Sequence, residues 1–317
     1  MNQTTDRRQF LKTTAALGVG LSLWGKGLPL LAAGEQLAKG APNAEKLGWR
    51  LGANTYTFQL FPLFEALDKI ASLGLKYVEF GPGARFSKTD STVVSDTMPQ
   101  AARKVLKKKA ADLGLQFVTY SSMDFFKDQD SSRKTFEFAK DMGVENLYFE
   151  STEDKLEWLD KLCAEYAINV AIHNHPKPAR YWSPEKVLAA VEGRSHRIGA
   201  LCDTGHWKRS GLDPVECLKK LEGRIICFHF KDLVKEGDGY HDVPWGTGVC
   251  NVRGMLEEVH RQKVKAPFSF EYEYHWENSL PELAKSVEYF DKVAADILSS
   301  ESAPAAPRRR RRQRTQA

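Results

Sequence analysis

The stretch Lys155–Pro176, KLEWLDKLCAEYAINVAIHNHP, contains one repeating unit of the fold. Its first part, residues 155–168, has apolar residues at spacings of three and four, as an amphipathic helix requires. Its second part, residues 169–176, is a short apolar run typical of a buried strand, and it ends in two histidines. Because side chains at positions i and i+2 of a strand point to the same side, we expect His173 and His175 to face the same way.

The same unit recurs along the chain. Eight apolar runs predict strands, at residues 49–58, 76–83, 116–123, 146–151, 169–176, 198–207, 225–233 and 267–274. Amphipathic segments follow them, at residues 63–75, 98–115, 133–144, 155–168, 184–194, 214–223, 252–262 and 280–298. A strand followed by a helix, eight times over, predicts a single-domain (β/α)8 TIM barrel. The turn after the first strand lacks the glycine pattern of a doubly wound nucleotide-binding fold.

The two ends of the chain differ from this pattern. We expect the barrel to occupy residues 49–298, with a linker at 35–48 and a disordered tail at 299–317. The tail contains six arginines; without them the chain has 40 basic residues against 41 acidic ones, although its full net charge is +5. The folded part is therefore not basic, and we expect no specific binding of nucleic acid.

Residues 1–34 have the order of a twin-arginine export signal. Arg7 and Arg8 precede a mildly apolar run, and small residues near position 33 provide a place for cleavage. The apolar run is too short and too rich in glycine for a membrane span. We therefore expect a periplasmic protein that has the twin-arginine export machinery as a partner, the alternative being a basic N-terminal tail. Nothing in the sequence indicates an oligomeric state.

The five cysteines do not form a disulfide or zinc framework. None of them belongs to a CxxC pair, and their number is odd. Cys163, Cys202 and Cys227 lie in apolar helix or strand patterns, so we expect them to be small buried residues.

Polar residues end most of the predicted strands, at the face where barrels of this kind carry their active sites. They are Glu79, Glu150, His173, His175, Asp203, His206, His229, Lys231, Asp232, Glu271 and Glu273. Each one alone is compatible with an ordinary structural role, such as a helix cap. Together they bring several carboxylates to one place, which is costly without a compensating cation. Mixed His, Asp and Glu ligands predict a divalent metal ion, with Mn, Co, Zn, Mg and Fe as candidates.

Four runs in the second half of the chain resemble the xylose isomerase-like TIM-barrel superfamily. They are CDTGHW at 202–207, FHFKDL at 228–233, WGTGVCNVRGML at 245–256 and FEYE at 270–273. The superfamily includes sugar phosphate isomerases and epimerases, inosose and dehydroshikimate dehydratases, and nucleases of the endonuclease IV type, and the resemblance extends over residues 49–298. It implies that Asp203, His229 and Glu271 are metal ligands.

The fifth strand departs from that resemblance. Epimerases of the superfamily usually have a glutamate ligand where this chain has His173, whereas here Glu150 ends the fourth strand. Either both residues bind the metal, or His173 carries a proton. Exported relatives with an HNHP stretch look like a separate branch, so the usual mechanism with two metal-bound glutamates does not carry over directly.

These residues lead to one functional hypothesis. A divalent metal is expected to be held by Glu150, Asp203, His229 and Glu271, with His173 as a fifth ligand. It would polarise a sugar carbonyl so that an adjacent C–H proton can be removed. His175 and His206 are candidate bases, and Lys231 is a candidate for stabilising the oxyanion. The outcome is isomerisation, epimerisation or elimination, and the expected substrate is an unphosphorylated keto-sugar or sugar derivative.

Two other classes of protein remain as alternatives. A metal phosphoesterase of the endonuclease IV type needs more histidine ligands, several of them from early strands, but no histidine precedes residue 173. A non-catalytic sugar-binding barrel would keep the metal site and bind sugars without turnover.

Overall fold

Eight parallel strands close into a barrel in the computed structural model, which describes residues 37–122, 126–237 and 239–302. Around the barrel the order is β1-β10-β7-β6-β5-β4-β3-β2, so each barrel strand pairs with the next one along the chain. The strands are β1 (Arg50–Asn54), β2 (Tyr77–Phe80), β3 (Gln116–Tyr120), β4 (Asn146–Phe149), β5 (Asn169–His173), β6 (Ile198–Asp203), β7 (Ile225–His229) and β10 (Pro267–Phe270).

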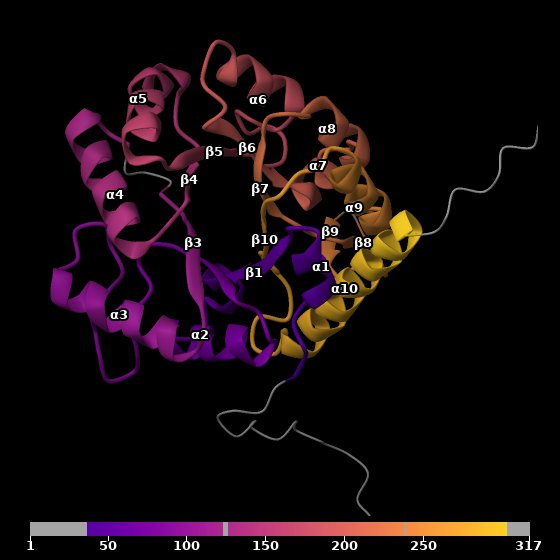
Figure 1. Cartoon of the computed structure of the whole chain (residues 1–317), viewed down its shortest axis with the longest axis horizontal. Helices are drawn as coiled ribbons and strands as arrows, with labels where there is room; N and C mark the ends of the chain where they lie inside the picture. Colours follow the sequence, from indigo (N-terminus) through magenta and orange to yellow (C-terminus); the bar gives the residue numbers. More distant parts are fainter. Residues whose placement is uncertain (1–36, 123–125, 238, 303–317) are drawn as a thin grey trace, which may run out of the picture. The chain divides into compact units, whose positions relative to one another are not determined.

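Helices surround this ring of strands (Figure 1). They are α2 (Leu63–Ser72), α3 (Gln100–Asp112), α4 (Gln129–Met142), α5 (Leu156–Tyr166), α6 (Pro184–Val191), α8 (Pro214–Lys220), α9 (Val252–Arg261) and α10 (Leu280–Ser302). Helix α5 shows why the sequence folds this way, because Leu156, Leu159 and Cys163 are buried on one of its faces. Helix α4 ends at Gly143, whose φ of 78° is a left-handed conformation that glycine adopts without strain.

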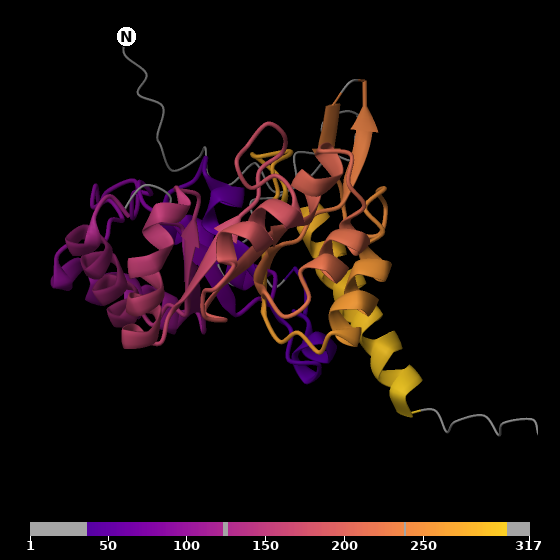
Figure 2. The same cartoon turned by 90° about the horizontal axis from the view of Figure 1, so that it is seen from above.

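The predicted fold is confirmed: each predicted strand and each predicted helix is present, and together they form a (β/α)8 barrel. The prediction did not include helix α7 (Thr204–Arg209) or the two strands of a hairpin after β7. Helix α7 begins directly after β6 because the Asp203 carboxylate accepts a hydrogen bond from the backbone N–H of His206 at 2.7 Å. After β7, strands β8 (Leu233–Glu236) and β9 (Gly239–Asp242) form an antiparallel hairpin that projects from one end of the barrel (Figure 2).

A short helix, α1 (Pro42–Lys46), lies in the segment that was expected to be a linker. It is attached to α10, because the backbone N–H groups of Asn43 and Ala44 donate to Asp291 Oδ1 at 2.6 and 3.1 Å. Residues 299–302, expected to begin the disordered tail, belong to α10. The predicted export signal at residues 1–34 and the arginine-rich part of the tail lie outside the described residues.

The five cysteines are free, as the sequence predicted, and the burial expected for Cys163, Cys202 and Cys227 is confirmed; Cys217 and Cys250 are buried as well. In the part of the chain that the structure describes, none of the helices has the length and apolar character that crossing a membrane requires.

Candidate active site

On four adjacent strands, side chains at alternate positions point into the centre of the barrel. An apolar layer in the interior consists of Tyr148, Ala171, Leu201 and Cys227. Two residues further along the same strands come Glu150, His173, Asp203 and His229. Since positions i and i+2 of a strand face the same side, the strands that bury the apolar layer also carry these polar groups to the barrel mouth.

His173 is held from outside by a carboxylate. Its Nδ1 lies 2.6 Å from Glu150 Oε1, and His175 Nε2 lies 2.7 Å from the same oxygen. An ionised carboxylate only accepts hydrogen bonds, so each histidine donates to it through that nitrogen. The other nitrogen of His173, Nε2, faces Asp203 Oδ2 at 3.7 Å. The His173 and His175 rings are 4.5 Å apart, which agrees with the expectation that they face the same way.

His229 is held in the same manner from the opposite side. Its Nε2 donates to Glu79 Oε1 at 2.8 Å, and its Nδ1 lies 3.1 Å from Glu271 Oε2 and 4.0 Å from Asp203 Oδ2. Asn54 Nδ2 donates to Glu79 at 2.9 Å and to Glu271 at 3.3 Å, which ties the two carboxylates together. A carboxylate that holds one imidazole nitrogen while the other faces a cluster of ligands is the usual arrangement around a metal-binding histidine.

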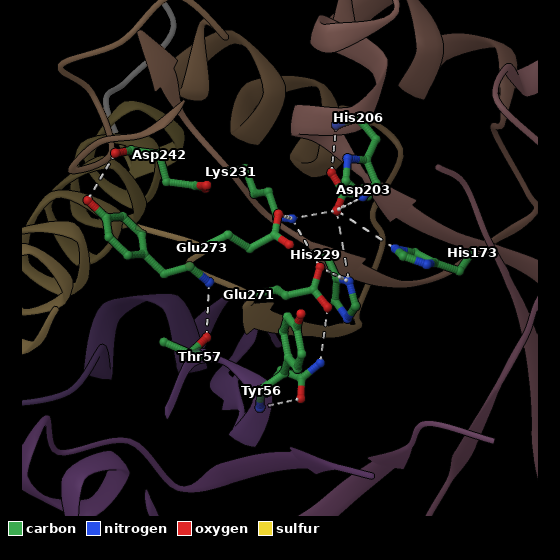
Figure 3. Close-up of polar contacts among 12 residues, drawn as sticks. Tyr56, Thr57, His173, Asp203, His206, His229, Lys231, Asp242, Glu271 and Glu273 are labelled. Carbon is green, nitrogen blue, oxygen red and sulfur yellow. Dashed lines mark hydrogen bonds and ion pairs between the residues drawn. The ribbon is translucent and has the colours of Figure 1, made fainter. Parts of the chain in front are cut away.

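The atoms that face this centre fit a divalent cation. His173 Nε2, Asp203 Oδ2 and His229 Nδ1 are buried, and none of them makes a hydrogen bond of suitable geometry within the described residues. Potential ligand atoms of His173, Asp203, His206 and Glu271 lie within 4.8 Å of one another. Figure 3 shows these side chains turned toward Asp203. Buried polar atoms without hydrogen bonds, in a mixed set of imidazoles and carboxylates, are what a metal such as Mn²⁺ or Zn²⁺ would use.

Lys231 is a fixed cation inside the same cluster. Its Nζ lies 3.0 Å from Asp203 Oδ2, 3.0 Å from Glu271 Oε2 and 2.8 Å from Glu273 Oε2, and its side chain is 1% exposed. An ammonium group has three hydrogens to donate, and three carboxylates surround this one. Lys231 donates hydrogen bonds to Glu271 and Glu273 and forms an ion pair with Asp203, so in this arrangement it neutralises carboxylates. The stabilisation of an oxyanion, the role expected from the sequence, stays a prediction.

His206 and His175 differ in what they offer a substrate. Arg209 Nη1 lies 3.2 Å from His206 Nδ1, and since a guanidinium only donates, the hydrogen of neutral His206 is on Nε2, 3.4 Å from Asp203 Oδ2. Burial lowers the pKa of His206 to about 2, so it is neutral near pH 7. His175 has a side chain that is 42% exposed, and because its Nε2 donates to Glu150, its Nδ1 is left to accept a proton. In this arrangement His206 presents an N–H and His175 presents a ring nitrogen with a lone pair.

The electrostatics of the cluster come from opposing effects of burial and charge. Although burial opposes ionisation, neighbouring basic groups keep the pKa values of Asp203 and Glu271 well below their usual range. Burial also opposes protonation of His173, His229 and Lys231, but the carboxylates around them raise their pKa values. Both imidazoles therefore bind a proton more readily than an exposed histidine does, and a divalent cation would compete with that proton, since ligands must be deprotonated.

The structure brings most of the predicted site residues together. The central cluster consists of His173, Asp203, His206, His229, Lys231 and Glu271, and His175 lies beside it. Glu150, predicted to be a ligand, holds the outer nitrogens of His173 and His175. Among the described residues, neither Glu150 nor His229 belongs to a group whose potential ligand atoms all lie within 4.8 Å of one another, but His229 Nδ1 lies 3.1 Å from Glu271 Oε2.

Several residues of the site were missed by the sequence prediction. Glu79 and Glu273 were noted at strand ends but given no role, and Asn54 and Tyr148 were not singled out. Asn54 is the last residue of β1, so its place at a strand end is the signal that would have found it. The Tyr148 ring lies 4.7 Å from the His173 ring and forms part of the floor below it.

A cavity of 1020 Å³ opens onto the cluster. At this end it is lined by Tyr148, His175, His206, Glu271 and Glu273. The two histidines and the two glutamates therefore reach the space that a small molecule would enter.

Comparisons with known proteins agree with this architecture. Over 93 residues the chain is 31% identical to an inosose dehydratase of Mesomycoplasma hyopneumoniae strain 7448, a match that spans 29% of this chain and 30% of that relative. The solved structure of an uncharacterized protein from Parabacteroides distasonis ATCC 8503 has a TM-score of 0.63 and 30% identity, and covers 77% of this chain and 99% of that one.

A Mycobacterium smegmatis protein solved in complex with magnesium has a TM-score of 0.64 at 16% identity, covering 79% of this chain and 98% of that one. The family model described as xylose isomerase-like TIM barrel matches residues 67–293, which is most of the barrel. The chain belongs to the xylose isomerase-like TIM-barrel family.

Proposed function

We propose that the protein is a divalent-metal-dependent enzyme that removes a proton next to the carbonyl of a keto-sugar or sugar derivative. The observation that carries the proposal is the pair of imidazoles, His173 and His229. Each is held by an outer carboxylate, and each presents its other nitrogen to Asp203. Support also comes from the matched relative named inosose dehydratase and from the related fold solved with magnesium.

The ligands we propose are His173 Nε2, Asp203 Oδ2, His229 Nδ1 and Glu271 Oε2. A divalent cation held there supplies Lewis-acid polarisation of a substrate carbonyl, which lowers the pKa of the adjacent C–H. Glu150 is assigned an orienting role, which differs from the direct ligation expected from the sequence. It keeps the Nε2 lone pair of His173 directed at the centre.

The chain's own residues divide the acid–base work. His175 takes the proton on Nδ1, and the Glu150 carboxylate at its Nε2 stabilises the imidazolium that forms. His206 donates the hydrogen on Nε2 to a substrate oxygen. Lys231 keeps the carboxylates of Asp203 and Glu271 ionised and in place. Return of the proton to carbon gives isomerisation or epimerisation, and loss of a β-substituent from the same intermediate gives elimination.

The experiment that tests this function is solvent deuterium exchange. A panel of keto-sugars and 3-oxo-glycosides is incubated in D₂O with the metal-loaded protein, and loss of each C–H signal is followed by NMR. We expect exchange at a carbon next to a carbonyl, reduced at least about 100-fold in His175→Asn, the low end of the usual gain from a general base. Sugar binding without exchange at any carbon would instead indicate a non-catalytic barrel.

The exported location is part of the proposal. Its support is the order of residues 1–34, with Arg7 and Arg8 ahead of a short apolar run. Changing both arginines to lysine should keep the full-length protein in the cytoplasmic fraction of a bacterial host, with the unchanged chain in the periplasmic fraction as control. Equal distribution of the two chains would contradict export by this route.

A further inference from the structure

The cavity over the cluster is larger than one sugar ring needs. Its volume of 1020 Å³ reaches the upper end of the range of roughly 300–1,000 Å³ found for sites that bind drug-sized ligands. A monosaccharide is much smaller than such a ligand. A sugar placed with its carbonyl at Asp203 and Glu271 therefore leaves a large part of the cavity unfilled.

The remaining part forms an arm with a different character. It lies between the segment that follows β1 and the segment that follows β2, and its lining includes Tyr56, Leu60, Phe61, Pro62 and Pro82. Five large apolar side chains are exposed in the described part of the chain, and two of them, Tyr56 (45%) and Leu60 (58%), line this arm. Exposed apolar surface that continues from an active site indicates a ligand-binding surface.

Hydrogen bonds and ring contacts hold the residues that line the arm in place. The Tyr56 backbone N–H donates to Asn54 Oδ1 at 3.0 Å, and its ring packs edge-on against Trp276 with 5.6 Å between centroids. Helix α2 holds the opposite wall, because the N–H of Leu63 donates to the carbonyl of Arg85 at 2.8 Å. Figure 3 shows Tyr56 at the side of the cluster where Glu271 lies, and both residues line the one cavity.

The chemistry of the arm distinguishes between two kinds of occupant. The long polar side chains that line it are Gln59 and Arg85. A second sugar ring brings several hydroxyl groups, and a hydroxyl buried without a partner is unfavourable. An aromatic ring needs few hydrogen bonds and packs well against Tyr56, Leu60 and Pro82.

Resting on the proposed function, we infer that the substrate is a sugar joined to an apolar ring, such as an aryl glycoside. The sugar lies at the His175 and Glu271 end of the cavity, and the ring lies in the arm against Tyr56, Leu60 and Pro82. The arm is a specificity subsite, distant from the atoms that exchange protons.

The test measures binding to the metal-loaded full chain by calorimetry. The probes are a 3-oxo-sugar, its methyl glycoside, its phenyl glycoside and a disaccharide of it, each set prepared on the 3-oxo forms of glucose, galactose and xylose, so that every probe has the carbonyl that the proposed reaction needs. We expect the phenyl glycoside of at least one sugar to bind about tenfold or more tightly than its methyl glycoside and the disaccharide. Leu60→Asp should abolish that preference, whereas Val105→Asp, at a residue 49% exposed on α3 and outside the cavity, should retain it.

Three results would overturn the inference: equal binding of phenyl and methyl glycosides, a disaccharide that binds as tightly as the phenyl glycoside, or no binding of any phenyl glycoside. Circular dichroism of both variants separates loss of the preference from loss of the fold. Failure of the proposed function is a separate outcome, because a clear preference for phenyl glycosides without C–H exchange in D₂O would support the subsite and reject the reaction.

Discussion

Glu79 provides a sharp test of how the metal centre is organised. Its side chain is 1% exposed, and it accepts hydrogen bonds from His229 Nε2 at 2.8 Å and Asn54 Nδ2 at 2.9 Å. Glu79→Gln keeps the shape of the side chain but removes its charge. The Nδ1 of His229 then becomes less basic, and the tautomer that directs its lone pair to the centre is no longer enforced.

The magnitude follows from that single interaction. A hydrogen bond to a charged group contributes about 1.5–3 kcal/mol, and tenfold in affinity corresponds to about 1.4 kcal/mol. We therefore expect Glu79→Gln to weaken metal binding by about 10–100-fold, which is also the usual effect of losing such an orienting partner. Competition with a fluorescent chelator, using Mn²⁺ and Zn²⁺ in turn, measures the change.

A matched control uses the same substitution elsewhere on the barrel. Glu145 accepts from Arg50 at 2.7 Å but is 49% exposed and lies before β4, so Glu145→Gln should leave metal affinity unchanged. Nitrogen NMR of His229 in the Zn²⁺-loaded proteins reports directly which ring nitrogen carries the hydrogen. If Glu79→Gln bound metal as tightly as the unchanged protein and the His229 resonances did not move, the orienting role of Glu79 would be refuted.

Three further outcomes are expected. Lys231→Met leaves the buried carboxylates of Asp203 and Glu271 without their fixed cation, so the free energy of unfolding, measured in the presence of a chelator, should fall by about 3–5 kcal/mol. Added metal should then stabilise this variant by more than it stabilises the unchanged protein. An equal gain from metal in both proteins would contradict this expectation. Burial raises the pKa of Asp242 to about 6, from 3.8, so the contribution of its protonated form to stability is fully present below about pH 4 and is lost as the pH rises through 6. Asp242→Asn should remove that loss, so that its free energy of urea unfolding falls by about 2–3 kcal/mol less between pH 4 and pH 7.5 than that of the unchanged protein. Parallel pH profiles of the two proteins would count against this expectation. Leu159→Ala leaves a cavity at a fully buried position on α5, so the free energy of unfolding should fall by about 2–5 kcal/mol in the same assay. A fall below about 1 kcal/mol would show that Leu159 is not packed in the core as described.

Much of the fold was readable because the barrel repeats one short-range pattern. The helix at 155–168 and the strand at 169–176 were recognised from apolar spacing alone, and the structure has them as α5 and β5. The β8–β9 hairpin was missed because its first residue, Leu233, was counted as the end of the predicted strand at 225–233. The glycines at 237 and 239, the first with a φ of 58°, were the signal of a turn that could have revealed it.

The site was predictable in position but not in orientation. Alternation places Glu150 and His173 at neighbouring strand ends, and the sequence correctly put both at the barrel mouth. Which of them faces the centre depends on side-chain torsions and on third partners. His175 supplies such a partner, because it shares Glu150 Oε1 with His173, so the carboxylate sits behind the imidazole. No spacing rule contains that information.

The central claim is that two imidazoles and two carboxylates form one metal centre. Its most direct measurement is a crystal structure of the protein grown with Mn²⁺ or Zn²⁺, with the ion located by its anomalous scattering. We expect one ion about 2.0–2.2 Å from His173 Nε2, Asp203 Oδ2, His229 Nδ1 and Glu271 Oε2, with Glu150 and Glu79 still on the outer nitrogens. An ion bound elsewhere, or a cluster without an ion in which Lys231 stays between Asp203 and Glu271, would show that these four residues do not form a metal centre.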